Sequence, residues 1–123
     1  MATLSQQLVL TSTTTSTDAL SISTTDSLSV TEPSINVARK SIATGGSTTV
    51  LAAVSGKITY LYIKVISGVT ATDTVEIDIA GAGVMRMGIG ECCFLPLKDN
   101  KLVEARAFGN ACVIEYGQWA KVV

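Results

Sequence analysis

The chain alternates short runs of β-branched and aromatic residues with polar turns, and no stretch of it keeps a helical period. Four runs have the length and composition of β-strands, at residues 58–66, 74–79, 92–97 and 111–116. The pattern therefore predicts an all-β protein.

The faces of these predicted strands differ. Residues 58–66 are apolar on both faces except for Lys64, which predicts a central strand. Residues 74–79 alternate cleanly, as in a strand with one buried face. The inward positions are Val75, Ile77 and Ile79, and the outward positions are Glu76 and Asp78. Pro96 has no N–H for a ladder, so 92–97 is expected at an edge or strand end.

Turn-forming residues separate the predicted strands. Glycine and asparagine, which supply the positive φ of tight turns, occur at 44–47, 55–57, 81–83, 88–90, 98–100 and 109–110. Short strands separated by such turns are typical of antiparallel sandwiches and barrels. We expect a single β-sandwich over residues 36–123, a jelly roll or a related Greek-key fold, whose strand order the pattern does not set.

Residues 1–35 differ from the rest and contain an eight-residue repeat. Residues 17–23, Thr-Asp-Ala-Leu-Ser-Ile-Ser, recur as 25–31, Thr-Asp-Ser-Leu-Ser-Val-Thr. The apolar positions of the two copies are Leu20, Ile22, Leu28 and Val30, and each alternates with a polar residue in the period of a strand.

Two interpretations of this Ser/Thr-rich segment remain open. It is either a disordered tail or an extended arm that gains its backbone hydrogen bonds by pairing with a neighbour. Low charge and β-type alternation favour the arm, and a lone hairpin is marginal in water. Residues 31–36 are the expected hinge, because Pro33 cannot donate a ladder hydrogen bond.

Composition and net charge limit the classes of partner to be expected. Of the 123 residues only 15% are charged, against roughly 25% in ordinary soluble domains, which indicates a surface that faces other proteins. The net charge of −1 gives no electrostatic reason to expect nucleic acid or an anionic membrane as partner. No signal peptide and no run of ~20 apolar residues is visible, so synthesis in a cytosol is expected.

The charges are unevenly spread along the chain. Residues 1–38 contain three acidic and no basic residues, whereas residues 39–123 hold all nine Lys and Arg against seven acids. An acidic arm and a basic body could pair between subunits, although a difference this small also arises by chance.

Residues that carry chemistry are few. The chain has no histidine, the commonest general base and zinc ligand. Cys92 and Cys93 are neighbours on a predicted strand and point to opposite faces, and with Cys112 they form neither a disulfide framework nor a zinc motif. Glu76 and Asp78 share a strand face and could hold a metal, but a solvated face explains them better. We expect no enzyme activity and no cofactor.

Two further residues are candidate interface positions. Arg86 stands between two methionines, either as an outward surface charge or as an ion-pair donor between subunits. Trp119, near the C-terminus, is typical of a core or interface anchor.

The chain resembles the small, histidine-poor virion proteins of tailed bacteriophages, notably phages of cyanobacteria and other aquatic bacteria. The segments that carry the resemblance are 20–30, 41–45, 58–64, 90–97 and 113–116. It implies a place in the virion as a capsid decoration (cement) protein that forms an oligomer, by preference a trimer, and binds the major capsid protein. The arm stripe of Leu20, Ile22, Leu28 and Val30 would then be the attachment surface.

Two alternatives stay open beside decoration. One is a phage tail component such as a tube, fibre or baseplate subunit. The other is a carbohydrate-binding β-sandwich module, which would require exposed aromatic side chains.

Overall fold

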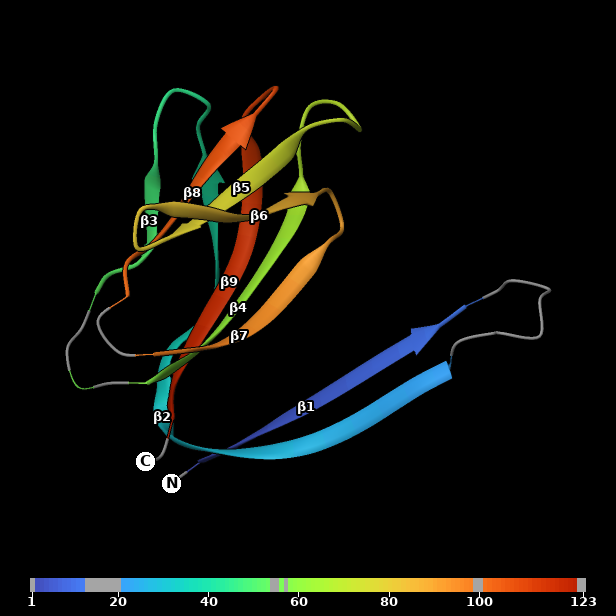
Figure 1. Ribbon diagram of the computed structural model, residues 1–123, viewed down its shortest axis with the longest axis vertical. Coiled ribbons are helices and arrows are strands. Elements are labelled where there is room, and N and C mark those ends of the chain that lie inside the picture. Colours follow the sequence, from blue (N-terminus) through green and yellow to red (C-terminus); the bar gives the residue numbers. More distant parts are fainter. Residues whose placement is uncertain (1, 13–20, 54–55, 57, 99–100, 122–123) are drawn as a thin grey trace.

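The computed structural model describes residues 2–12, 21–53, 56, 58–98 and 101–121, with the backbone alone for residues 2 and 31–36. The described residues form nine strands and no helix. The strands make two antiparallel sheets, which confirms the expected all-β, sandwich-like class (Figure 1).

The five-stranded sheet has the order β1-β2-β9-β4-β7. Its strands are β1 (Ala2–Thr11), β2 (Ser21–Ile42), β9 (Cys112–Lys121), β4 (Thr59–Ser67) and β7 (Cys92–Leu97). The four-stranded sheet has the order β3-β8-β5-β6. Its strands are β3 (Thr48–Leu51), β8 (Val103–Phe108), β5 (Thr74–Ile79) and β6 (Ala82–Gly88).

Strand pairing is nested along the chain. β5 pairs with β6, β4 with β7, β3 with β8 and β2 with β9, each antiparallel. The chain from β2 to β9 is thus one long, folded-back ribbon of four strand pairs. The additional β4–β9 and β5–β8 ladders roll this ribbon into two sheets.

Alternating apolar residues from both sheets form the core. Leu61, Ile63 and Val65 of β4 are fully buried, and so are Val75 and Ile77 of β5 in the opposite sheet. Because strand side chains alternate between faces, one apolar face of each sheet meets the other and the intervening residues point outward.

Several strand predictions are confirmed. β5 and β7 have the predicted bounds, and β4 differs from its prediction by one residue at each end. β4 lies inside its sheet, as expected, and β7 with Pro96 is an edge strand. β9 runs on to Lys121, five residues beyond the predicted end.

The turn between β5 and β6 shows why glycine is needed there. Ala80 and Gly81 have φ values of 53° and 83°, the pair of left-handed conformations found in tight hairpin turns. The turn predicted at 81–83 therefore lies one residue earlier than expected.

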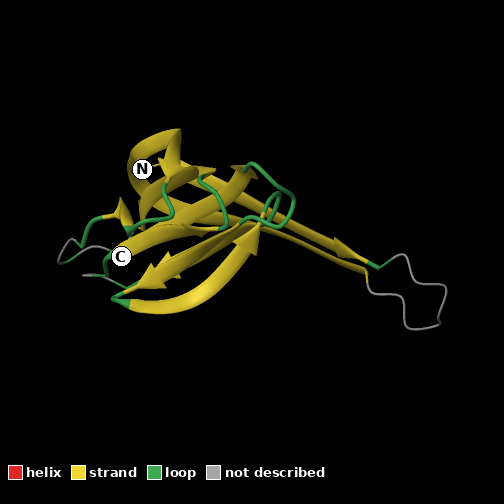
Figure 2. Cartoon of the chain, turned by 90° about the horizontal axis from the view of Figure 1, so that it is seen from above, coloured by secondary structure: helices red, strands yellow, loops and turns green. Residues whose placement is uncertain are grey.

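The N-terminal segment is a β-hairpin that projects from the sandwich. β1 pairs with the first half of β2, from Ala2 opposite Val30 to Thr11 opposite Ser21. The hairpin extends well beyond the body (Figures 1 and 2). The expectation that residues 21–30 find backbone partners only in a neighbour is wrong, because β1 of the same chain supplies them.

β2 continues through the predicted hinge. The strand runs from the hairpin into the sandwich without a break, and its second half pairs with β9. The register shifts three times between Val30 and Ala38, on both sides of Pro33. Bulges of this kind accommodate a residue without an N–H and let a strand bend.

Candidate assembly interface

One face of the hairpin is apolar and the other carries hydroxyl groups. The antiparallel register places apolar positions of both strands together on one side, which we call the apolar face: Leu4, Leu8, Leu10, Ile22, Leu28 and Val30. Gln6, Thr24 and Asp26 interrupt it. The opposite face has Val9 as its only aliphatic side chain among Ser, Thr and Gln residues.

Exposure along the apolar face rises from base to tip. Val30, where β2 meets the sandwich, is 1% exposed, and Leu28 and Leu4 are half-buried. Leu8, Leu10 and Ile22, toward the tip, are 44%, 45% and 38% exposed. The body of the protein therefore covers the base of the apolar face and leaves its tip open to solvent.

Aromatic side chains gather on the outer face of the five-stranded sheet. In register, Tyr60 lies opposite Trp119, and Tyr62 lies opposite Phe94. These four residues are four of the six aromatics in the chain. The Tyr60 and Phe94 rings stack with their centroids 5.5 Å apart. This face points away from the core, because the neighbouring residues Leu61 and Ile63 point inward.

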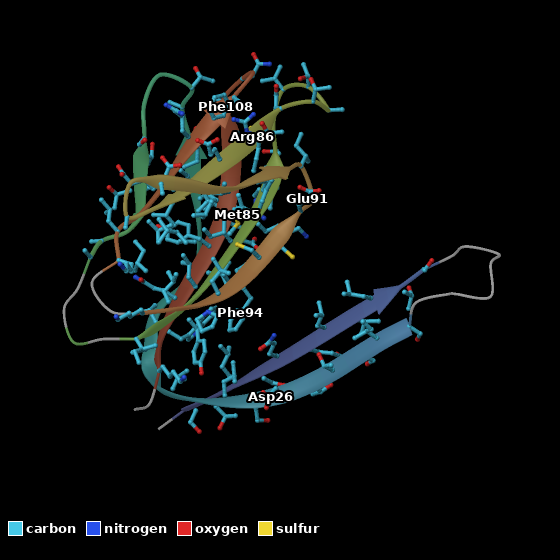
Figure 3. The ribbon with its side chains drawn as sticks, viewed as in Figure 1. Asp26, Met85, Arg86, Glu91, Phe94 and Phe108 are labelled. Atoms are coloured by element: carbon cyan, nitrogen blue, oxygen red, sulfur yellow. The ribbon has the colours of Figure 1, made fainter. Side chains whose placement is uncertain are left out.

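A groove of about 350 Å³ separates the aromatic surface from β1. Its walls are Leu4, Ser5, Gln6, Gln7 and Leu8 of β1 and Tyr62, Cys92, Cys93, Phe94 and Trp119 of the body. Figure 3 shows Phe94 on the side of β7 that faces the hairpin. Both edge strands of the five-stranded sheet thus border one groove, because the bend of β2 brings β1 round toward β7.

Two of the aromatic side chains that line the groove, Tyr62 and Trp119, are held in place by residues of β9. The Tyr62 hydroxyl donates a hydrogen bond to Glu115 Oε1 at 3.2 Å. Burial, and after it this hydrogen bond, raises the pKa of Tyr62, so the phenol stays protonated near neutral pH. Trp119 lies over Gly117, where a Cβ would stand 2.8 Å from its ring. The glycine therefore allows the indole to lie flat against the sheet.

All three cysteines are free thiols. Cys92 is exposed at the groove, whereas Cys93 packs against the core, as expected for neighbours on a strand. Burial raises the pKa of Cys93 and of Cys112, which makes both poor nucleophiles. Cys92 is therefore the accessible thiol of this surface.

The structure places the other predicted interface residues as follows. Ile22, Leu28 and Val30 share the apolar face, whereas Leu20 lies outside the described residues. Trp119 lines the groove. Arg86 lies on β6 in the other sheet, and its guanidinium is 2.9 Å from Glu76 Oε2 and 4.1 Å from the Phe108 ring centroid (Figure 3). Arg86 thus has partners within its own chain.

Of the acidic pair of β5, Glu76 has a structural explanation. Glu76 also approaches Arg106 at 3.5 Å, and the Arg106 guanidinium lies 4.8 Å from the same Phe108 ring. Two cations around one carboxylate and one aromatic ring make a compact surface network. In the described part of the chain, no three acidic or cysteine side chains are grouped as metal ligands would be.

Sequence reasoning missed half of the interface. The leucines of β1 follow the same period of two as Ile22, Leu28 and Val30, and this alternation was the available signal. The gathering of Tyr62, Phe94 and Trp119 had no local signal, because these residues come from three strands.

Comparison with known proteins finds no matching family model, curated protein or solved structure. Within the described ranges, no helix is long and apolar enough to cross a membrane.

Proposed function

We propose that this chain is a non-enzymatic structural protein of a bacteriophage virion, which oligomerises and decorates the capsid shell. The observation that carries this proposal is the hairpin, whose apolar face is covered at its base and open at its tip. An apolar surface held out from the body by a hydrogen-bonded support is suited to protein–protein contact.

The strand pairing supports the proposal at the level of the fold. Four nested antiparallel pairs in two sheets support the assignment of a jelly roll, a fold that occurs in viral capsid proteins and in lectins. Since one fold serves many functions, this is support by analogy. The hairpin, which lies outside the nested pairs, is what distinguishes this chain as an assembly module.

A decoration protein is held firmly because many copies bind the same shell. On its apolar face, each open hairpin tip offers three apolar side chains through which one copy can join another, a modest area. On a symmetric shell the same small contact repeats many times, and linked copies bind far more tightly than one alone. The low charge of the chain agrees with a surface that meets protein on several sides.

The test is the copy number of the protein in purified particles of the phage that encodes it, measured by quantitative mass spectrometry. Decoration predicts an amount about equimolar with the shell subunit, as for any component that follows the shell symmetry. A small number of copies in each particle would assign the protein to the tail. Complete absence would contradict the virion role.

Carbohydrate binding is the second candidate, and the observation that favours it is the aromatic lining of the groove. Tyr62, Phe94 and Trp119 are half-buried and accessible from one side. A glycan array distinguishes the two candidates. A bound glycan whose affinity is lost in Trp119→Ala, together with absence of the protein from particles, would replace the structural proposal with this one.

A further inference from the structure

We infer that the hairpin tip of one copy docks into the groove of a second copy of this chain. The docking side chains are Leu10 and Ile22, with Leu8, the last residue of its own groove wall, at their edge. The receiving side chains are Tyr62, Phe94 and Trp119. This inference rests on the proposed function, because it names the partner through which the structural protein oligomerises.

The reach of the hairpin shows why its own body cannot cover the tip. Within one chain, β1 forms the groove wall only as far as Leu8. Leu10 and its register partner Ile22 lie further along the hairpin, which extends beyond the body (Figures 1 and 2). The exposed fractions of 45% and 38% follow from this geometry. The described part of the body leaves these side chains exposed, so a second molecule is able to cover them.

The groove matches the tip in chemistry and size. Its body wall is aromatic, and its volume of about 350 Å³ accepts a few aliphatic side chains but no whole strand or sheet. The exposed apolar tip and the aromatic groove are therefore complementary surfaces of the same chain. Burial of both on association removes apolar area from water, the main favourable term in protein association.

Charge complementarity points to a second copy as the partner. The first 38 residues carry three acids and no base, and the remainder has nine bases against seven acids. Asp26 is exposed on the apolar face of the hairpin, and among the described residues its carboxylate accepts a hydrogen bond only from the backbone of Ser27. On the groove side, Lys64 lies next to Cys92 and makes no ion pair within the described chain.

The two charges suit one docked geometry. With Leu10 and Ile22 in the groove of a neighbour, Asp26 lies at the flank of the docked hairpin and Lys64 at the flank of the groove. Each copy gives one tip and receives one, which is a head-to-tail contact. Such contacts close into rings when the rotation permits, in agreement with the trimer expected from the resemblance.

The first experiment measures the molar mass of the full chain by sedimentation velocity and by light scattering after size exclusion. The test variant is Leu8→Ser/Leu10→Ser, and the matched control is Val9→Ser. Val9 is between the two leucines and 55% exposed, but it points to the opposite face. We expect an oligomeric wild type, an oligomeric control, and self-association weakened at least about tenfold in the test variant.

Two results of this experiment would overturn the inference. One is a wild type that is monomeric at all accessible concentrations. The other is a test variant that associates as strongly as the control. Circular dichroism of each variant confirms that the sandwich is folded, as expected for changes at exposed hairpin positions.

A crosslinking experiment locates the contact. Leu10→Cys is joined to the native Cys92 by a short bismaleimide, in a mixture of isotopically light and heavy chains. We expect mixed light–heavy crosslinks between position 10 and Cys92, and at least tenfold fewer with Val9→Cys. Crosslinks within single chains only, or equal yields from both variants, would contradict docking of the tip in the groove.

The failure of this inference and that of the proposed function are distinguishable. A monomeric chain present at high copy number on particles would overturn self-docking and leave the decoration role in place. An oligomer that assembles through the tip but is absent from particles would overturn the decoration role and leave self-docking in place.

Discussion

At the scale of single residues, Asp73 does more for the fold than its place in an exposed loop suggests. Asp73 is 1% exposed. It accepts hydrogen bonds from the backbone N–H groups of Val69 and Thr70, both at 2.8 Å, and from the Thr70 hydroxyl at 2.9 Å. It also accepts two from Asn110, at 3.2 and 3.1 Å. Asp73 thus joins the β4–β5 loop to the β8–β9 turn.

These hydrogen bonds predict a dependence of stability on pH. The Thr70 N–H is the main cause that lowers the pKa of Asp73 from 3.8 to about 2. Because the folded pKa is depressed, the contribution of Asp73 is complete above about pH 4 and is lost as the pH falls through about 2. We expect wild type to unfold several degrees above Asp73→Asn at pH 7, with the difference shrinking between pH 4 and 2.

Thermal unfolding followed by circular dichroism at stepped pH measures this difference. Asp26→Asn is the control, since Asp26 is exposed and, within the described ranges, accepts a hydrogen bond only from the N–H of Ser27. A difference between wild type and Asp73→Asn that is the same at pH 2 and pH 7 would contradict the assigned role.

Gly109, in the β8–β9 turn, is the second residue on which the connection to Asp73 depends. Its φ is +93°, and a Cβ there would lie 2.5 Å from Asp73 Oδ1. Gly109→Ala therefore strains the backbone and displaces the carboxylate. We expect a loss of ~1–3 kcal/mol in the free energy of unfolding, measured by urea denaturation. Gly45→Ala, which has open space around its Cβ, should change stability little; equal effects of both substitutions would be evidence against this explanation.

At the scale of elements, the hairpin and the sandwich have different sources of stability. β9 and β4 lie inside a sheet and carry core residues such as Ile63 and Ile114. The outer half of the hairpin has two strands, hydrogen bonds at one edge of each, and side chains open to water. Two-stranded structures of this kind are only marginally stable on their own in water.

This difference predicts a gradient of backbone hydrogen exchange. Amides of residues 8–11 should exchange through local opening of low free energy, and those of 61–65 only through global unfolding. Exchange measured by mass spectrometry on the wild type and on Leu8→Ser/Leu10→Ser separates intrinsic protection from protection by assembly. Residues 8–11 should be better protected in the oligomer than in the variant, and identical exchange in both would contradict docking of the tip.

Strands were predictable from sequence where the signal was local. The alternation of Val75 and Ile77 and the turn residues around them defined β5. The extension of β9 was missed because Gly117 looks like a strand end, yet it pairs with Tyr62 and lies under Trp119. The apolar run around Arg86 predicted a strand, which is β6. β1, β3 and β8 escaped prediction, as did the nested pairing, which depends on contacts between distant segments.

One half of the candidate interface, the β2 side of the apolar face, was predictable because its signal is also local. Ile22, Leu28 and Val30 share a strand period, so one strand of the apolar face was predictable. That β1 pairs with this strand, and that the paired hairpin meets an aromatic surface, depends on the bend of β2 between Val30 and Ala38. Bends and registers of this kind are set by tertiary packing, which local patterns do not encode.

At the scale of the whole molecule, the acidic N-terminal segment and the basic body attract each other when one copy docks on another. The described contacts within one chain include no ion pair between hairpin and body. Head-to-tail docking brings Asp26 of one copy toward Lys64 of the next. Attraction between these charges orients the tip as it enters the groove, while the buried leucines supply most of the affinity.

A charge reversal tests this orientation. Asp26→Lys and Lys64→Asp each place like charges at the flank of the docked hairpin, so each should weaken self-association. The double variant Asp26→Lys/Lys64→Asp restores opposite charges between copies and should recover the affinity. An exposed ion pair changes affinity by roughly twofold to fivefold, and the effect should fade in high salt. Sedimentation equilibrium at low and high salt gives the four affinities. Additive losses in the double variant would mean that Asp26 and Lys64 do not meet, and would require the hairpin to dock in a different direction.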